Sequence, residues 1–154
     1  MIRVSTRVLY GLRAIIYIGV NKDKWPISLN EVSVNQNIPL RYIEQIFIRF
    51  RKAGIVKSIR GVNGGYILRD NFEQISLLEI VETADSKISL AWCLAPSSKR
   101  KCPIVEDCVV AHIWSELGKN IREYLSRITL GELIEKAKDT NFIQMIQNMG
   151  VRQY

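Results

Sequence analysis

The sequence predicts a mainly α-helical fold with one small β-hairpin, and three observations support this. Apolar residues recur at three- and four-residue spacings in several separate stretches. Three of these stretches open with a Ser or Thr placed three residues before a Glu, the pattern of a helix N-terminal cap. One Gly-rich turn separates two short runs rich in β-branched and aromatic residues. We therefore expect several short helices, one hairpin and one longer helix.

The first two helices are predicted from caps and spacing. Ser5 or Thr6 can cap a first helix, which continues at helical spacing to about Val20. Ser28 and Glu31 then form a capping-box pattern, so a second, short helix begins after Ser28.

A third helix and the hairpin follow. Pro39 suits a first helical turn and Gly54 suits a C-terminal cap. The apolar stripe between them consists of Ile43, Ile46, Phe47 and Phe50. Residues 55–60 and 66–69 read as strands around the turn at 61–65. Two short helices followed by a hairpin are typical of a winged helix-turn-helix, in which the second helix enters the major groove of DNA.

The second half contains a cap, a loop and a long helix. Ser76 and Glu79 predict a short helix through about Ala84, and 85–104 lacks a sustained period. A long helix is expected from about Val105, and Thr129 opens a last short one. The seam of the long helix consists of Val110, Trp114, Leu117, Ile121, Tyr124 and Ile128.

These elements divide the chain into four parts. Residues 1–84 are expected to form the winged helix-turn-helix, and 85–104 a cysteine-containing sensor loop. Residues 105–137 supply the long dimerisation helix and the last short helix, and 138–154 form a tail of weak pattern.

Charge is concentrated in the first half of the chain. The net charge is +7, and residues 1–70 contain 12 Lys or Arg against 4 Asp or Glu, a balance of +8. Residues 71–154 contain 10 against 11, a balance of −1. This asymmetry favours contact between the first half and a polyanion such as double-stranded DNA, although a solvated basic face has the same composition.

The third helix and the turn supply the candidate DNA-reading residues. On the helix, the polar face can hold phosphates or reach base edges. In the turn, Arg60 suits a narrow minor groove, and the glycines let the backbone approach closely. The candidates are Arg41, Tyr42, Glu44, Gln45, Arg49, Arg60, Gly61 and Gly64.

The three cysteines of the chain, Cys93, Cys102 and Cys108, lie within sixteen residues, with intervals of eight and five. No export signal or membrane-spanning run is apparent, so we expect a cytoplasmic protein without a membrane partner, whose thiols stay reduced. Such thiols can be metal ligands, redox groups or core residues. His112, four residues after Cys108, is the candidate fourth ligand, with a structural role as the alternative. No nucleophile–base pair or phosphate loop is apparent, so we do not expect an enzyme.

Five features together resemble the winged-helix iron–sulfur regulators typified by IscR and NsrR. They are YIEQIF at 42–47, RKAG at 51–54, IRGVNGGY at 59–66, the three cysteines, and ITLGEL at 128–133. The resemblance covers nearly all of residues 1–137. It implies a homodimer joined through the long helix, a roughly palindromic operator, and an iron–sulfur cluster on the three cysteines, in a two-iron or four-iron form.

The chain departs from the typical members at three places. Its first cysteine interval is eight residues where members have five, His112 lies one residue beyond the usual ligand histidine, and Leu9 stands where some members have a ligand aspartate. The fourth ligand is therefore unassigned.

We accordingly expect a sequence-specific transcriptional regulator, most simply a repressor, controlled by the cluster. Two alternatives are a metal-free regulator that senses oxidants through the same thiols, and a winged-helix interaction protein without operator specificity.

Overall fold

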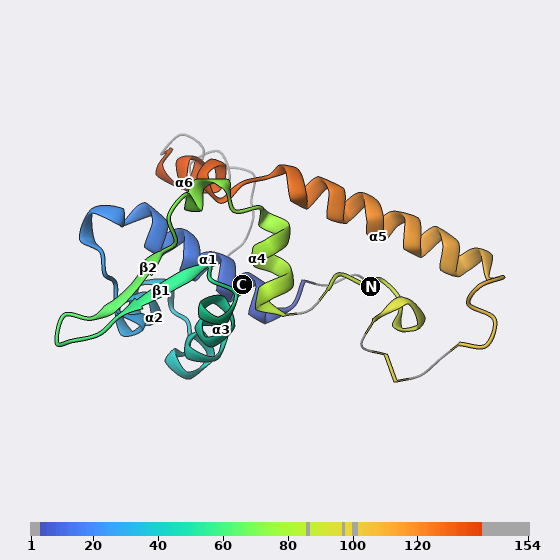
Figure 1. The fold of residues 1–154 in the computed structure, drawn as a ribbon, viewed down its shortest axis with the longest axis horizontal. Helices are drawn as coiled ribbons and strands as arrows, with labels where there is room; N and C mark the ends of the chain where they lie inside the picture. The colour runs from blue at the N-terminus through green and yellow to red at the C-terminus, as the bar shows by residue number, and fades with distance from the viewer. Residues whose placement is uncertain (1–3, 86, 97, 100–101, 140–154) are drawn as a thin grey trace.

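The computed structural model describes residues 4–85, 87–96, 98–99 and 102–139. This part is mostly helical, with one two-stranded antiparallel sheet, so the predicted fold class is confirmed (Figure 1). The helices and strands are α1 (Thr6–Val20), α2 (Leu29–Gln36), α3 (Leu40–Lys52), β1 (Val56–Ile59), β2 (Gly65–Leu68), α4 (Leu77–Ala84), α5 (Val109–Arg127) and α6 (Leu130–Lys138). Single 3₁₀ turns cover Lys22–Lys24, Phe72–Gln74 and Trp92–Leu94.

Helix α1 lies at the centre of the core and contacts α2, α3, α4 and α6. Its residues Ile15 and Ile18 are completely buried, and the whole predicted stripe of α3 is buried with them. Burying that stripe fixes the rotation of α3 about its own axis, because the apolar face must point into the core. The opposite, polar face is thereby turned toward solvent.

Side-chain caps begin the helices where the sequence predicts them. The hydroxyl of Ser5 accepts a hydrogen bond from the Val8 N–H, and Ser76 does the same for Glu79. The box at Thr129 is complete, since the Glu132 carboxylate also accepts from the Thr129 N–H.

The capping boxes expected at Ser28 and Ser76 are only half formed, which corrects the prediction. In both, the serine caps the helix, but the glutamate carboxylate binds elsewhere. Glu31 accepts from the Tyr17 hydroxyl at 3.2 Å, and burial together with this contact raises the pKa of Tyr17. Glu79 accepts two bonds from the Arg69 guanidinium, at 2.9 and 3.2 Å. Partners that are distant in sequence thus replace the local bond.

The hairpin is anchored to the body by a third backbone segment. Tyr66 in β2 exchanges two hydrogen bonds with Ile27, of 2.8 and 3.0 Å. The Phe47 ring of α3 packs edge-on against the Tyr66 ring, with centroids 5.1 Å apart. A Cβ atom at Gly65 would lie 2.5 Å from the carbonyl carbon and oxygen of Ile27, so this close approach requires glycine.

Gly65→Ala is therefore expected to destabilise the fold by about 1–3 kcal/mol, as overpacking does in other tight sites. Urea unfolding followed by circular dichroism measures the change. The matched control is Ser58→Ala, an exposed position in β1. Equal midpoints for the two variants would show that the contact between Gly65 and Ile27 is not tight in solution.

The long helix begins later than predicted. It was expected from about Val105, but α5 starts at Val109 with Cys108 as its N-cap, and Ile128 is its C-cap rather than a seam residue. Residues 103–107 form turns instead, one of them closed by the Val105 N–H and the Cys102 carbonyl at 3.3 Å. The predicted loop also contains a 3₁₀ turn around Cys93. Of the predicted tail, residues 140–154 lie outside the described part.

In Figure 1, α5 projects away from the rest of the fold and carries the cysteine segment at its far end. Near its C-terminal end α5 packs against α4, and it also contacts the 3₁₀ turn at Trp92–Leu94. Among the described residues, no helix has the length and apolarity needed to cross a membrane.

Candidate DNA interface and cysteine site

The polar face of α3 presents Arg41, Glu44 and Gln45, all exposed. Each is held outward because the buried stripe occupies the other side of the helix. Tyr42, the fourth residue expected here, is half-buried, and its ring packs edge-on against Tyr10 of α1 at 5.4 Å. Tyr42 thus also fixes the spacing between α1 and α3.

A hollow of about 310 Å³ lies beside this face, between α1 and α3. It is lined by Arg7, Tyr42, Gln45, Ile46, Ile48, Arg49 and Lys52. Three of these side chains are cations, so the flank of α3 that faces α1 is basic.

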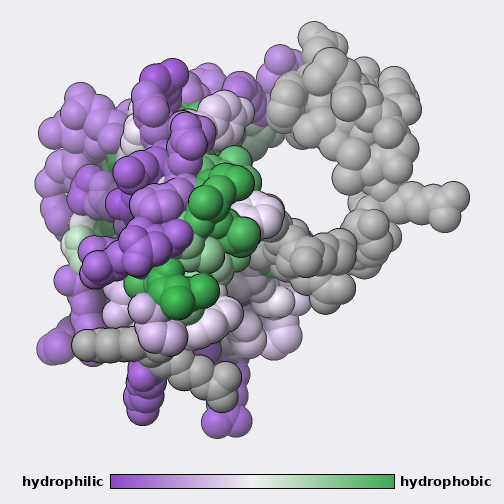
Figure 2. All heavy atoms as spheres, turned by 90° about the vertical axis from the view of Figure 1, so that its right-hand side faces the viewer, coloured by the Kyte–Doolittle hydropathy of each residue, from purple (hydrophilic) through white to green (hydrophobic). Residues whose placement is uncertain are grey.

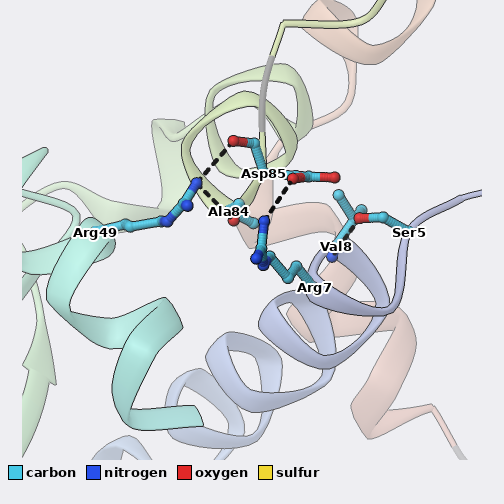
Figure 3. Close-up of polar contacts among 6 residues, drawn as sticks. All are labelled: Ser5, Arg7, Val8, Arg49, Ala84 and Asp85. Atoms are coloured by element: carbon cyan, nitrogen blue, oxygen red, sulfur yellow. Dashed lines mark hydrogen bonds and ion pairs between the residues drawn. The ribbon is translucent and has the colours of Figure 1, made fainter. Parts of the chain in front are cut away.

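Arg49 does not extend freely from this surface, in contrast to its expected place among the reading residues. Its Nη1 donates to the backbone carbonyl of Asp85 at 2.7 Å and lies 3.5 Å from that of Ala84 (Figure 3). Arg7 of α1 forms an ion pair with the Asp85 carboxylate at 3.2 Å. The sequence contains no local signal for these contacts, since Asp85 lies 36 residues after Arg49.

The hairpin turn places Arg60 fully on the surface, next to Gly61 with φ of +121°. A Cβ atom at Gly64 would lie 2.5 Å from the Ile59 carbonyl oxygen, so glycine keeps the turn tight. At the other end of the hairpin, Lys57 pairs with Asp70 at 2.7 Å, and this contact lowers the pKa of the Asp70 carboxyl. Within the described part of the chain, neither Arg41 nor Arg60 has a hydrogen-bond or ion-pair partner.

The three cysteines are free thiols, and all are half-buried. Cys93 and Cys102 line one hollow of about 480 Å³, with Ala95, Ser98, Pro103, Val105 and Glu106. Cys108 is at the start of α5 and does not line it. In the described ranges no three His, Cys, Asp or Glu side chains lie close enough together to bind one metal ion.

His112 is exposed, and its Nε2 lies 3.0 Å from the Glu106 backbone carbonyl. One ring nitrogen of this candidate ligand is therefore engaged with the turn that precedes α5. Its own N–H donates to the Cys108 carbonyl at 3.1 Å, the first hydrogen bond of the helix.

The donor set suits an iron–sulfur cluster in its chemistry, because thiolates are the ligands that such clusters use. Two of the three cysteines already line one hollow, and the third is six residues along the chain from Cys102. The basic run that precedes Cys102 includes residues 100–101, which lie outside the described part.

Comparisons with known proteins agree with this architecture. A family model described as Rrf2, iron-dependent transcriptional regulator, matches residues 4–136. The HTH-type transcriptional regulator IscR of Cronobacter sakazakii is 33% identical over 132 residues, covering 86% of this chain and 80% of that protein. A solved structure of T. potens IscR superposes with a TM-score of 0.69 at 31% identity, covering 89% of each chain. CymR, the global cysteine regulator of B. subtilis, also superposes with a TM-score of 0.69, at 28% identity over 88% of this chain and 98% of that one.

Proposed function

The chain belongs to the Rrf2 family of DNA-binding transcriptional regulators, and on that premise we propose that it is a homodimeric repressor controlled by an iron–sulfur cluster. The observation that carries the DNA part is the exposed polar face of α3, next to a hairpin whose glycine-rich turn begins with the exposed Arg60. A helix with this face fits a major groove, while Arg60 fits the adjacent minor groove.

The long helix supports the dimer. Its apolar seam is uncovered in the single chain, with Val110 60%, Trp114 37% and Tyr124 67% exposed. Figure 2 views the molecule from the side toward which α5 projects and shows hydrophobic atoms exposed among hydrophilic ones. A two-fold dimer that buries this seam would present two α3 helices to a roughly palindromic operator.

The cysteines support the cluster. Cys93, Cys102 and Cys108 would hold it, and the cluster would supply a redox-sensitive and oxidation-labile centre. His112 and Glu106 are candidates for a fourth ligand, through the Nδ1 atom of the one and the carboxylate of the other, since Glu106 lines the hollow and His112 lies against the Glu106 carbonyl. On this proposal, binding draws Cys108 toward the hollow and so changes the path of residues 85–108.

Selection from a random DNA pool tests the DNA function. The expected product is a symmetric site whose two halves are about one helical turn apart. Competition with scrambled DNA at fixed salt then gives the specificity ratio. Equal competition by scrambled DNA would overturn operator recognition and leave an interaction protein with a winged fold.

Arg60→Ala and Glu44→Ala are expected to change DNA binding in different ways. Arg60→Ala removes one cation from the wing of each subunit, so it should weaken binding and reduce the magnitude of the slope of log K against log salt by about 0.9 per subunit, or about 1.8 per dimer. Glu44→Ala should mainly relax discrimination at one base position, by about 1–3 kcal/mol. Fluorescence anisotropy with the selected site and single-base variants measures both. Unchanged affinity and discrimination in both variants would mean that the reading surface lies elsewhere.

A second candidate is a thiol switch without metal. It is favoured by the hollow that Cys93 and Cys102 share, where a peroxide could oxidise the two thiols to a reversible disulfide while being reduced itself. CymR of Staphylococcus aureus, which superposes with a TM-score of 0.65 at 28% identity, is described in an oxidised form. Peroxide-dependent DNA binding by iron-free protein would favour the thiol switch over the cluster.

A further inference from the structure

The C-terminal end of α4 contacts both α1 and α3. Asp85 is the C-cap of α4 and the first residue of the cysteine-containing segment. Its carbonyl accepts from Arg49 of α3 at 2.7 Å, and its carboxylate pairs with Arg7 of α1 at 3.2 Å. Figure 3 shows the two arginines approaching this one residue from two different helices.

One helical turn earlier, Glu82 contacts both α5 and the segment that follows α4. Its Oε1 accepts from the guanidinium of Arg122 in α5, and also from the backbone N–H of Ile88 at 3.4 Å. Ile88 lies in the segment that leads to Cys93. A single turn of α4 therefore connects the DNA-reading helix with both the cysteine segment and the long helix.

These contacts are suited to transmit a change rather than to hold the fold. A guanidinium that binds the last carbonyls of a helix is favourably placed, because those carbonyls lack helical partners and carry partial negative charge. The ion pairs are partly exposed, with side-chain exposures of 45% and 30% for Arg7 and Asp85, and such pairs add little to stability. They can therefore be broken at low cost when the segment after Asp85 moves.

We infer that Arg49 is a positioning residue for α3, and that Glu82 and Asp85 relay the state of the cysteine segment to the DNA-reading surface. This inference rests on the proposed control of DNA binding by the cysteines. When residues 85–108 change path, the Asp85 carbonyl shifts. Arg49 either moves with that carbonyl or loses its hydrogen bond to it. Because Arg49 is a residue of α3, the tilt of α3 against α1 then changes. The same move alters the Arg7 contact on α1.

The test measures DNA affinity in two forms of the protein, cluster-loaded and metal-free, for wild type and five variants. Glu82→Gln and Arg49→Ala each weaken the relay, Asp85→Ala removes the Arg7 pair but keeps the carbonyl that Arg49 binds, and Arg49→Lys keeps the charge. Arg51→Ala is the matched control, since it removes an exposed cation from the opposite flank of α3. For wild type we expect the two forms to differ by about 5–150-fold, the usual range of allosteric coupling.

In Glu82→Gln and Arg49→Ala that difference is expected to fall below about threefold, while Arg51→Ala keeps it and both Arg49→Lys and Asp85→Ala retain part of it. Glu82→Gln is the most informative variant, because within the described residues the hydrogen bonds of Glu82 go to Ile88 and Arg122 and not to α3 or a cysteine. A wild-type difference that persists in Glu82→Gln and Arg49→Ala would overturn the relay.

The salt dependence of the metal-free form separates positioning from direct contact. If Arg49 positions α3, Arg49→Ala changes affinity with an unchanged salt slope. A slope reduced in magnitude by about 0.9 per subunit, or about 1.8 per dimer, would instead make Arg49 a phosphate contact and overturn its positioning role. This readout does not need the cluster. Equal wild-type affinities in the two forms would therefore count against the proposed sensing and the relay that rests on it, while the slope still decides the role of Arg49.

Discussion

Cys102→Ser is expected to abolish the visible absorbance of the anaerobically prepared protein and, with it, the dependence of DNA affinity on cluster state. Cys102 is the central cysteine, and it shares its hollow with Cys93 and its flanking turn with Cys108. A hydroxyl is a much poorer cluster ligand than a thiolate, so the substitution leaves only two of the three cysteine ligands. Absorbance spectra with iron and sulfide analysis measure the result.

Ala95→Ser is the matched control for that variant. It adds a hydroxyl to the same hollow and removes no sulfur, so its colour and iron content should match those of wild type. Retained colour in Cys102→Ser would exclude this cysteine as a ligand. Colourless wild-type protein containing stoichiometric zinc would contradict the cluster itself.

Trp114→Glu is expected to separate the dimer and to weaken operator binding by about 10²–10⁴-fold, the size of the avidity that two linked half-site contacts provide. Trp114 lies in the uncovered seam of α5, and a carboxylate there would be buried without a partner in the dimer. Analytical ultracentrifugation gives the oligomeric state, and anisotropy gives the affinity.

Lys119→Glu is the control for Trp114→Glu, because Lys119 lies on the opposite side of α5 and is exposed. It should remain dimeric with little change in affinity. A Trp114→Glu protein that stays dimeric would place the dimer contact away from this seam.

Local features were predictable because local physics determines them. The buried stripe of α3 follows from apolar spacing within one helix, and the cap at Thr129 joins residues three apart. The hairpin turn at 61–65 follows from the backbone freedom of glycine. None of these depends on a distant partner.

Distant contacts account for the features that the sequence did not predict. The carboxylates of Glu31 and Glu79 accept hydrogen bonds from Tyr17 and Arg69, 14 and 10 residues away, instead of from the N-cap backbone of their own helices. The contact of Arg49 with Asp85 spans 36 residues and redirects a cation that helical spacing alone would place in solvent. Such pairings depend on how the helices pack, which no pattern within a single helix specifies.

The cysteine site was predictable in its residues but not in its arrangement. Composition and clustering single out Cys93, Cys102 and Cys108, while the late start of α5 depends on the turns at 103–107. The contact between His112 and the Glu106 carbonyl had no signal in the sequence, because it joins a side chain to a backbone atom of a turn.

Control of DNA binding by the cysteines is measured most directly by the affinity of wild-type protein for its selected operator in the cluster-loaded and metal-free forms, at one fixed salt concentration. We expect the two affinities to differ by at least about fivefold, the lower end of allosteric coupling, and both to exceed the affinity for scrambled DNA. Equal affinities in the two forms would contradict control by the cysteine segment.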